Sequence, residues 1–382
     1  MGNETQLTSK NQRFKFIDAA RSIAILLMLE GHFITLTLDT SSFDNESNIY
    51  ATWRFIKGFT APLFFSITGI ILVYLLCKYK DQEFFKITRV KKGFKRAIKL
   101  LFWGYLLQLN ILYFNEYLAL NFDSWCFAFH VLQCIALGMI VCLLIFGLFK
   151  VIHRGKLYIY YLIAGTIVFL FYPLMKSLPP ETYFPKNSPE IIQNIFKGPY
   201  SVFPIVPWIG FVLYGGAVGA FVSHYKKRIE SNFFCILFIL AGSALHFVPW
   251  QILSVIDWLF NTSIVMSAGL IARFGQVLIL LGILIFLTRS FKKSDSLFLR
   301  IGQNTLSIYI IHVIILYSGI FGIGLDKVLK NTLTPLESIF GAICFIAFFV
   351  LFTHHYHFFK NKWIWLKRAP YKLLFSKLIK KH

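Results

Sequence analysis

Long apolar segments recur along the whole chain, and they constrain its fold more than any other feature. A helix needs roughly 20 apolar residues to cross about 30 Å of hydrocarbon, and the 382-residue sequence contains ten such segments. The sequence therefore predicts an all-α, polytopic integral membrane bundle of about ten transmembrane helices. The predicted spans, with ends placed to within a few residues, are about 16–38, 58–77, 98–115, 126–149, 157–175, 204–223, 233–256, 268–288, 304–323 and 336–353.

Composition supports this class of protein. Hydrophobic residues make up 57% of the chain and charged residues only 15%, whereas soluble domains have roughly 45–50% and about 25%. The six cysteines fall in or beside the predicted helices and show neither a CxxC motif nor a Cys/His ligand spacing. We therefore expect apolar packing for these cysteines and no metal site.

The distribution of charge predicts the orientation. The chain has 39 Lys and Arg against 17 Asp and Glu, a net charge of +22, which in a soluble protein would suggest a nucleic-acid partner. When the connecting segments are assigned alternately to two sides, the side of the N-terminus receives 30 bases and five acids, and the other side receives seven bases and ten acids. Positive residues mark the cytoplasmic side. Both termini are thus predicted to be cytoplasmic, and no nucleic-acid partner is expected.

The predicted domain organisation is simple. Residues 1–355 form one membrane domain, and the basic, Trp- and Phe-containing segment 356–382 is expected to be an amphipathic tail on the cytoplasmic surface. We expect the protein to reside in the cell membrane or inner membrane.

The first predicted helix contains four ionisable residues, which are costly in a membrane and therefore candidates for function. Asp18, Arg21 and His32 share one helical face, and Glu30 points away from Arg21. Along the axis, Arg21 and His32 are roughly 16 Å apart. A purely structural interpretation is also open: Asp18 and Arg21 form an i,i+3 ion pair, and His32 extends to the outer interface.

Five stretches of the chain resemble known membrane acyltransferases. The segment RFKFIDAARSIAILLMLEGHF (13–33), with an Arg, ten residues and a His, resembles the opening helix of the acyltransferase 3 family. FTAPLFFSITG (59–69), VLQ (131–133) and FPIVPWIG (203–210) resemble the heparan-alpha-glucosaminide N-acetyltransferase-like family, and GQNTLSIYIIH (302–312) is similar to the late-helix signature of both.

The resemblance implies transfer of an acyl group, expected to be acetyl, from cytosolic acyl-CoA to a glycan hydroxyl or amine across the membrane. Acyl-CoA is then a donor substrate, and no permanently bound cofactor is expected. Three departures are Ser22, where Gly is usual, Cys134, where the heparan-type branch has Arg, and the lack of His in residues 39–57. These departures argue against glucosamine N-acetylation in particular, and we expect O-acetylation of an envelope polysaccharide, lipopolysaccharide or other glycan.

Site roles follow from this resemblance. His32 becomes the catalytic residue, as a general base or as the carrier in an acyl-His intermediate, with Arg21 and Asp18 beside it. The phosphates of CoA are expected to bind bases of the 78–99 segment, particularly Arg89, Lys91 and Lys92, although anionic lipid is an alternative partner for these bases. Further substrate-binding candidates, for which helix-to-helix hydrogen bonding is the alternative, are Gln133, His130, Trp208, Arg273 and His312.

Two other functional classes compete with acyl transfer. Intramembrane charges in a bundle of this size also suit a transporter or flippase for a glycan or small anionic metabolite. A catalytically inactive scaffold or sensor would bind CoA at most and transfer nothing.

Overall fold

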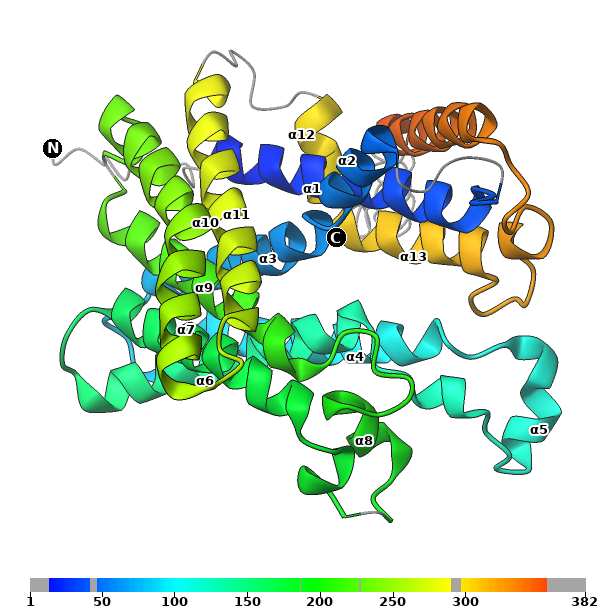
Figure 1. The fold of residues 1–382 in the computed structure, drawn as a ribbon, viewed down its shortest axis with the longest axis horizontal. Coiled ribbons are helices and arrows are strands. Elements are labelled where there is room, and N and C mark those ends of the chain that lie inside the picture. The colour runs from blue at the N-terminus through cyan, green and yellow to red at the C-terminus, as the bar shows by residue number, and fades with distance from the viewer. Residues whose placement is uncertain (1–13, 42–46, 186, 227, 290–296, 356–382) are drawn as a thin grey trace, which may run out of the picture.

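The computed structural model describes residues 14–41, 47–185, 187–226, 228–289 and 297–355, and in these ranges the chain is helical with isolated β-bridges and no strands (Figure 1). The predicted all-α class is therefore confirmed. The predicted tail 356–382 lies outside the described residues.

Within the described ranges, eight helical segments are long and apolar enough to cross a membrane. This confirms a multi-pass helical membrane protein. The segments are α1 (Lys15–Thr37), α2 with α3 (Asn48–Lys57 and Thr60–Cys77), α6 (Val131–Ile152), α7 (Leu157–Ser177), α9 (Ile205–His224), α10 (Asn232–Phe260), α11 (Met266–Thr288) and a last helix over Pro335–His355.

A ninth candidate span is broken. Helices α12 (Leu297–Gln303) and α13 (Thr305–Tyr317) meet at Asn304 with a bend of 78°, where a single span over 304–323 was expected. Ser22 ties α12 to α1, because its hydroxyl donates to the carbonyl of Phe298 at 2.5 Å and accepts from the backbone N–H of Gly302 at 2.9 Å. A Cβ at Gly302 would meet the Asp18 carbonyl oxygen and lie 2.7 Å from Ser22 Oγ, so this approach requires glycine.

The third predicted span is shifted. A helix was expected over 98–115, but α4 covers Thr88–Leu106 and takes in six of the bases assigned to a loop. Its buried residues Val90, Gly93, Ala97 and Leu100 recur at the helical period, which makes α4 amphipathic rather than uniformly apolar. This apolar stripe packs α4 against α6, beside which it runs in Figure 1.

The centre of the bundle is a close pairing of α3 and α9. A Cβ at Gly69 would overlap the carbonyl oxygen of Val212, and one at Gly215 or Gly219 would overlap that of Ser66 or Ile70. Small residues of this kind let the two backbones touch, which is how membrane helices gain packing energy without a hydrophobic driving force.

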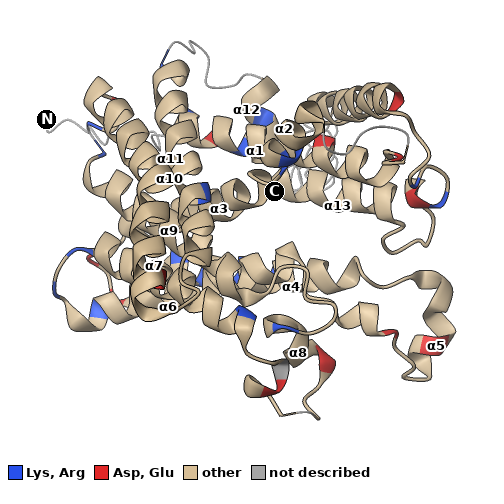
Figure 2. Ribbon diagram, in the orientation of Figure 1, with Lys and Arg blue, Asp and Glu red and all other residues tan. Residues whose placement is uncertain are grey.

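In the part of the chain that the structure describes, three isolated parallel bridges join connections at one end of the bundle: Leu38↔Leu333, Asn110↔Ile320 and Phe129↔Ser201. Each bridge joins a residue within four positions of the end of a long helix to a segment distant in sequence. Figure 2 shows acidic residues on α5 (Phe114–Leu118) and near α8 (Glu190–Phe196), both of which belong to this end.

Candidate active site

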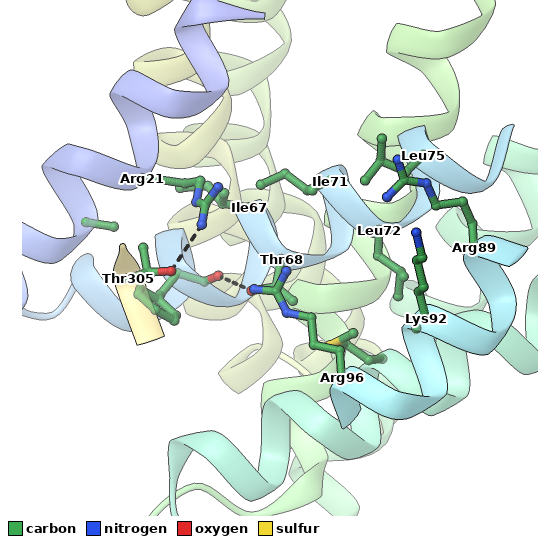
Figure 3. A pocket seen from close by; sticks show the side chains of 14 residues that line it. Arg21, Ile67, Thr68, Ile71, Leu72, Leu75, Arg89, Lys92, Arg96 and Thr305 are labelled. Carbon is green, nitrogen blue, oxygen red and sulfur yellow. Dashed lines mark hydrogen bonds between the residues drawn. The ribbon is translucent and has the colours of Figure 1, made fainter. Parts of the chain in front are cut away.

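A cavity of about 200 Å³ lies between α1, α3, α4 and α13, and four cationic side chains line it (Figure 3). Arg21 comes from α1, and Arg89, Lys92 and Arg96 come from α4. The remaining walls are mostly apolar. We call this the cation pocket, lined in full by Arg21, Ala24, Phe64, Ile67, Thr68, Ile71, Leu72, Leu75, Arg89, Lys92, Gly93, Arg96, Met139 and Thr305.

The three bases of α4 reach the pocket because of their helical spacing. Arg89, Lys92 and Arg96 are at i, i+3 and i+7, which places them within about 60° of one another around the helix axis. Lys91 and Lys95 lie on another side of α4 and do not line the pocket. The prediction that Lys91 acts together with Arg89 and Lys92 therefore finds no support in the pocket geometry.

Contacts to Thr305 and Asp18 help to hold Arg21 in the pocket. Its Nη2 donates to Thr305 Oγ1 at 3.1 Å, and its Nη1 lies 3.8 Å from the carboxylate of buried Asp18. The i,i+3 ion pair between Asp18 and Arg21 that the sequence left open is thus present. The Arg21 guanidinium still faces the cavity in Figure 3. With Arg89, Lys92 and Arg96 nearby, the pocket has the chemistry of an anion site, because arginine and lysine donate charge-assisted hydrogen bonds to phosphate.

A second polar group, the histidine cluster, is formed by His32, His312 and Tyr317. His32 Nδ1 lies 2.8 Å from Tyr317 Oη, and the His32 ring centroid is 5.3 Å from that of His312 and 5.7 Å from that of Tyr317. His32 is exposed, whereas His312 is fully buried with no well-aligned hydrogen-bond partner for either ring nitrogen among the described residues. An accessible imidazole with a fixed neighbour is suited to proton transfer or nucleophilic attack.

Lys57 and His130 also interact electrostatically with His32. The Lys57 side chain runs along Gly31, where a Cβ would lie 3.3 Å from Lys57 Cγ, and its ammonium lies 5.3 Å from the centre of the Trp53 ring. Trp53 in turn donates from Nε1 to Glu30 at 2.6 Å. Glu30 therefore anchors α2 rather than facing the cation pocket.

The family model for the catalytic region of heparan-alpha-glucosaminide N-acetyltransferase matches residues 13–247. The chain belongs to this family. It is accordingly a multi-pass membrane protein of an acetyltransferase family. No curated protein matches the chain.

The family match covers Arg21, His32 and the α4 bases, but it ends before α13 and its residues Thr305, His312 and Tyr317. The sequence resemblance to the heparan-type family is confirmed. The resemblance to the acyltransferase 3 family stays a prediction.

Two of the remaining substrate-binding candidates lie in packed surroundings. Gln133 is fully buried, with Nε2 3.4 Å from the Ala128 carbonyl and no partner for Oε1 among the described residues. Trp208 belongs to an aromatic group with Phe203 and Phe65, at centroid distances of 4.8 and 5.5 Å. Neither residue lines the cation pocket.

Arg273 joins two helices. It donates from Nη1 to the carbonyl of Phe55 at 2.9 Å and lies 4.5 Å from the centre of the Phe55 ring. Carbonyls in the last turn of a helix have no partner within it, so Arg273 of α11 caps the end of α2. This contact holds in place the turn that carries Lys57.

Sequence reasoning did not select three residues that the structure brings into the two groups, Arg96, Thr305 and Tyr317, or Lys57, which lies beside the histidine cluster. Arg96 was counted only among the bases of the 78–99 segment. Arg96 lies seven residues after Arg89, and this spacing places the two on one face of a helix. The spacing indicates a shared face only for a helix that begins near Thr88, as α4 does. Tyr317 follows His312 in the chain, but no local signal relates it to His32.

Proposed function

We propose that the protein transfers an acetyl group from cytosolic acetyl-CoA to a hydroxyl group of a glycan on the opposite side of the membrane. The observation that carries the proposal is the placement of the cation pocket and the histidine cluster along the same face of α1, one near each end. One extended donor molecule would then contact both.

The cation pocket is proposed to bind the phosphates of CoA. Arg89, Lys92, Arg96 and Arg21 offer several donors to a multiply charged anion. The bias of 30 bases to seven supports placing this end of the bundle in the cytosol, with both termini there. The donor nucleotide would therefore bind from the side on which acetyl-CoA is made.

The pantetheine arm is proposed to extend along α1. Arg21 and His32 are roughly 16 Å apart along the helix axis, a length comparable to that of the extended arm. The thioester would then lie beside His32 while the phosphates remain in the cation pocket.

At the histidine cluster, the reaction needs a base. The acceptor oxygen attacks the thioester carbonyl carbon, and its proton passes to His32. The carbon–sulfur bond then breaks, and the CoA thiolate leaves and takes up a proton. A route through acyl-His32 requires the same geometry, with the imidazole nitrogen as the first nucleophile.

The choice of a hydroxyl acceptor rests on the sequence between α1 and α3. The heparan-type branch has its active histidine in the loop after the first helix, and residues 39–57 contain none. An O-acetyl product on an envelope polysaccharide is therefore proposed in place of an N-acetyl product.

The transporter alternative is favoured by one observation, the 78° break between α12 and α13, since interrupted helices are typical of transporter binding sites. Acetyl-CoA turnover separates the two. Protein in nanodiscs should bind CoA and release free thiol from acetyl-CoA when a glycan acceptor is supplied, and the H32A variant should bind CoA without releasing thiol. Absence of CoA binding would reject acyl transfer in favour of transport, and full turnover by H32A would reject His32.

A further inference from the structure

Among the described residues, Tyr317 is the hydrogen-bond partner of the His32 side chain. Its Oη is 2.8 Å from Nδ1, and the two rings meet edge to face at 82°. The ring centroids of His312 and His32 are 5.3 Å apart, so the His32 ring has an aromatic neighbour in addition to Tyr317.

The position of Tyr317 is set by the end of α13. Tyr317 is the last residue of that helix, and Ser318 follows with a positive φ of 57°. The Ser318 hydroxyl is hydrogen-bonded to the Asp326 carboxylate, which ties the following loop to the helix end. The phenol is thereby held against α1 although 285 residues separate it from His32.

A neutral imidazole has one N–H and one basic nitrogen, and the hydrogen bond at one nitrogen determines the state of the other. For His32 to take a proton through Nε2, Nδ1 must carry the hydrogen. A phenol oxygen 2.8 Å away can accept that hydrogen. Because His32 is exposed, Nε2 then remains available to the acceptor.

We propose that Tyr317 is a positioning residue that accepts a hydrogen bond from Nδ1–H of His32 and so keeps Nε2 as the basic nitrogen. This inference rests on the proposed function, because it assigns a role in the same proton transfer. It adds a residue from the C-terminal part of the chain, beyond the region matched by the family model.

The tautomer is measurable without turnover. Protein labelled with ¹⁵N-histidine is reconstituted in nanodiscs, and ¹⁵N–¹H correlation spectra distinguish Nδ1–H from Nε2–H for each of the ten histidines. The His32 signal is the one lost in H32Q. We expect Nδ1–H for His32 in the unmodified protein and a shift to Nε2–H in Y317F.

Tyr309 provides the matched control. It lies on the same helix, with its ring 4.9 Å from that of His312. Y309F also removes a phenol hydroxyl, but it leaves the hydrogen bond between Tyr317 and His32 in place. The tautomer should be unchanged in Y309F. In turnover, Y317F should lower kcat about tenfold, the equivalent of one lost hydrogen bond, with the KM for acetyl-CoA unchanged.

Two results would overturn the inference: Nε2–H at His32 in the unmodified protein, or an unchanged tautomer in Y317F. Failure of the proposed function has a different signature, since a protein that transfers no acetyl group from acetyl-CoA would still display the tautomer change.

Discussion

Arg21 on α1 donates a 3.1 Å hydrogen bond to Thr305, the first residue of α13. Toward the other end of the same two helices, His32 is paired with Tyr317, the last residue of α13. The intervals along the two axes are similar, roughly 16 Å on α1 and about 18 Å on α13. Helices α1 and α13 therefore contribute one residue each to the contact at the cation pocket and one residue each to the contact at the histidine cluster.

Removing the Thr305 hydroxyl should weaken donor binding. In T305V the Arg21 guanidinium loses its hydrogen bond to Thr305, and we expect the Kd for CoA to rise about two- to tenfold, the usual value of one hydrogen bond. Isothermal titration in nanodiscs measures this change. T353V is the control, because the Thr353 hydroxyl is buried in the last helix and bonds only the carbonyl of Phe349 among the described residues. An unchanged Kd in T305V would contradict the role of this contact.

Charge on the face of α4 that lines the cation pocket should affect the Kd for CoA, and charge on the adjoining face should leave that Kd unchanged. R96Q removes a cation from the cation pocket and should raise the Kd for CoA roughly tenfold or more, as expected for a charge-assisted bond to phosphate. K95Q alters the neighbouring residue, which does not line the pocket, and should leave the Kd near that of the unmodified protein. The difference between the two variants should shrink at high salt. Equal effects would indicate nonspecific attraction by the whole basic helix.

A methyl group added at the close contact between α3 and α9 should lower the stability of the protein. In G215A the new Cβ would overlap the Ser66 carbonyl oxygen, so the two backbones must separate and the thermal midpoint should fall by several degrees. In G269A the nearest atoms to the new Cβ are 3.7 Å away on Trp250, and the midpoint should hardly change. Thermal unfolding of the two purified variants compares them directly, and equal midpoints would contradict close packing at Gly215.

Orientation is testable with single cysteines. In a background without the six native cysteines, N121C and H153C place a thiol at exposed positions near opposite ends of α6. An impermeant maleimide added to intact cells should label N121C alone and should label H153C only after permeabilisation. The reverse pattern would mean that the termini lie outside.

Local periodicity made α1 predictable. Its polar residues Asp18, Arg21 and His32 repeat with the helix on a mostly apolar segment, and in the structure Arg21 lines the cation pocket while His32 lies beside Tyr317. The span predicted over 98–115 was displaced from α4 because the bases of α4 lower the mean hydropathy of a segment that still buries an apolar stripe. An amphipathic helix of this kind needs its spacing counted rather than its hydropathy averaged.

The contacts of α13 were beyond a sequence-based prediction for a different reason. Tyr317 meets His32 across 285 residues, and Arg21 meets Thr305 across 284. Such pairs are set by which helices become neighbours. The helix that precedes the break at Asn304 is hydrogen-bonded to a residue of α1, because the backbone N–H of Gly302 donates to the Ser22 hydroxyl. In the sequence, Ser22 stands out only as a departure from the family pattern.

The separation of Arg21 from His32 along α1 has an energetic consequence. A carrier bound by its phosphates at one depth and presenting its thioester at another would leave its charged portion on the side of origin. Only a neutral two-carbon fragment would then traverse the hydrocarbon layer. The work of crossing would be supplied by the free energy of the thioester, and the reaction would draw on neither ion gradients nor the membrane potential.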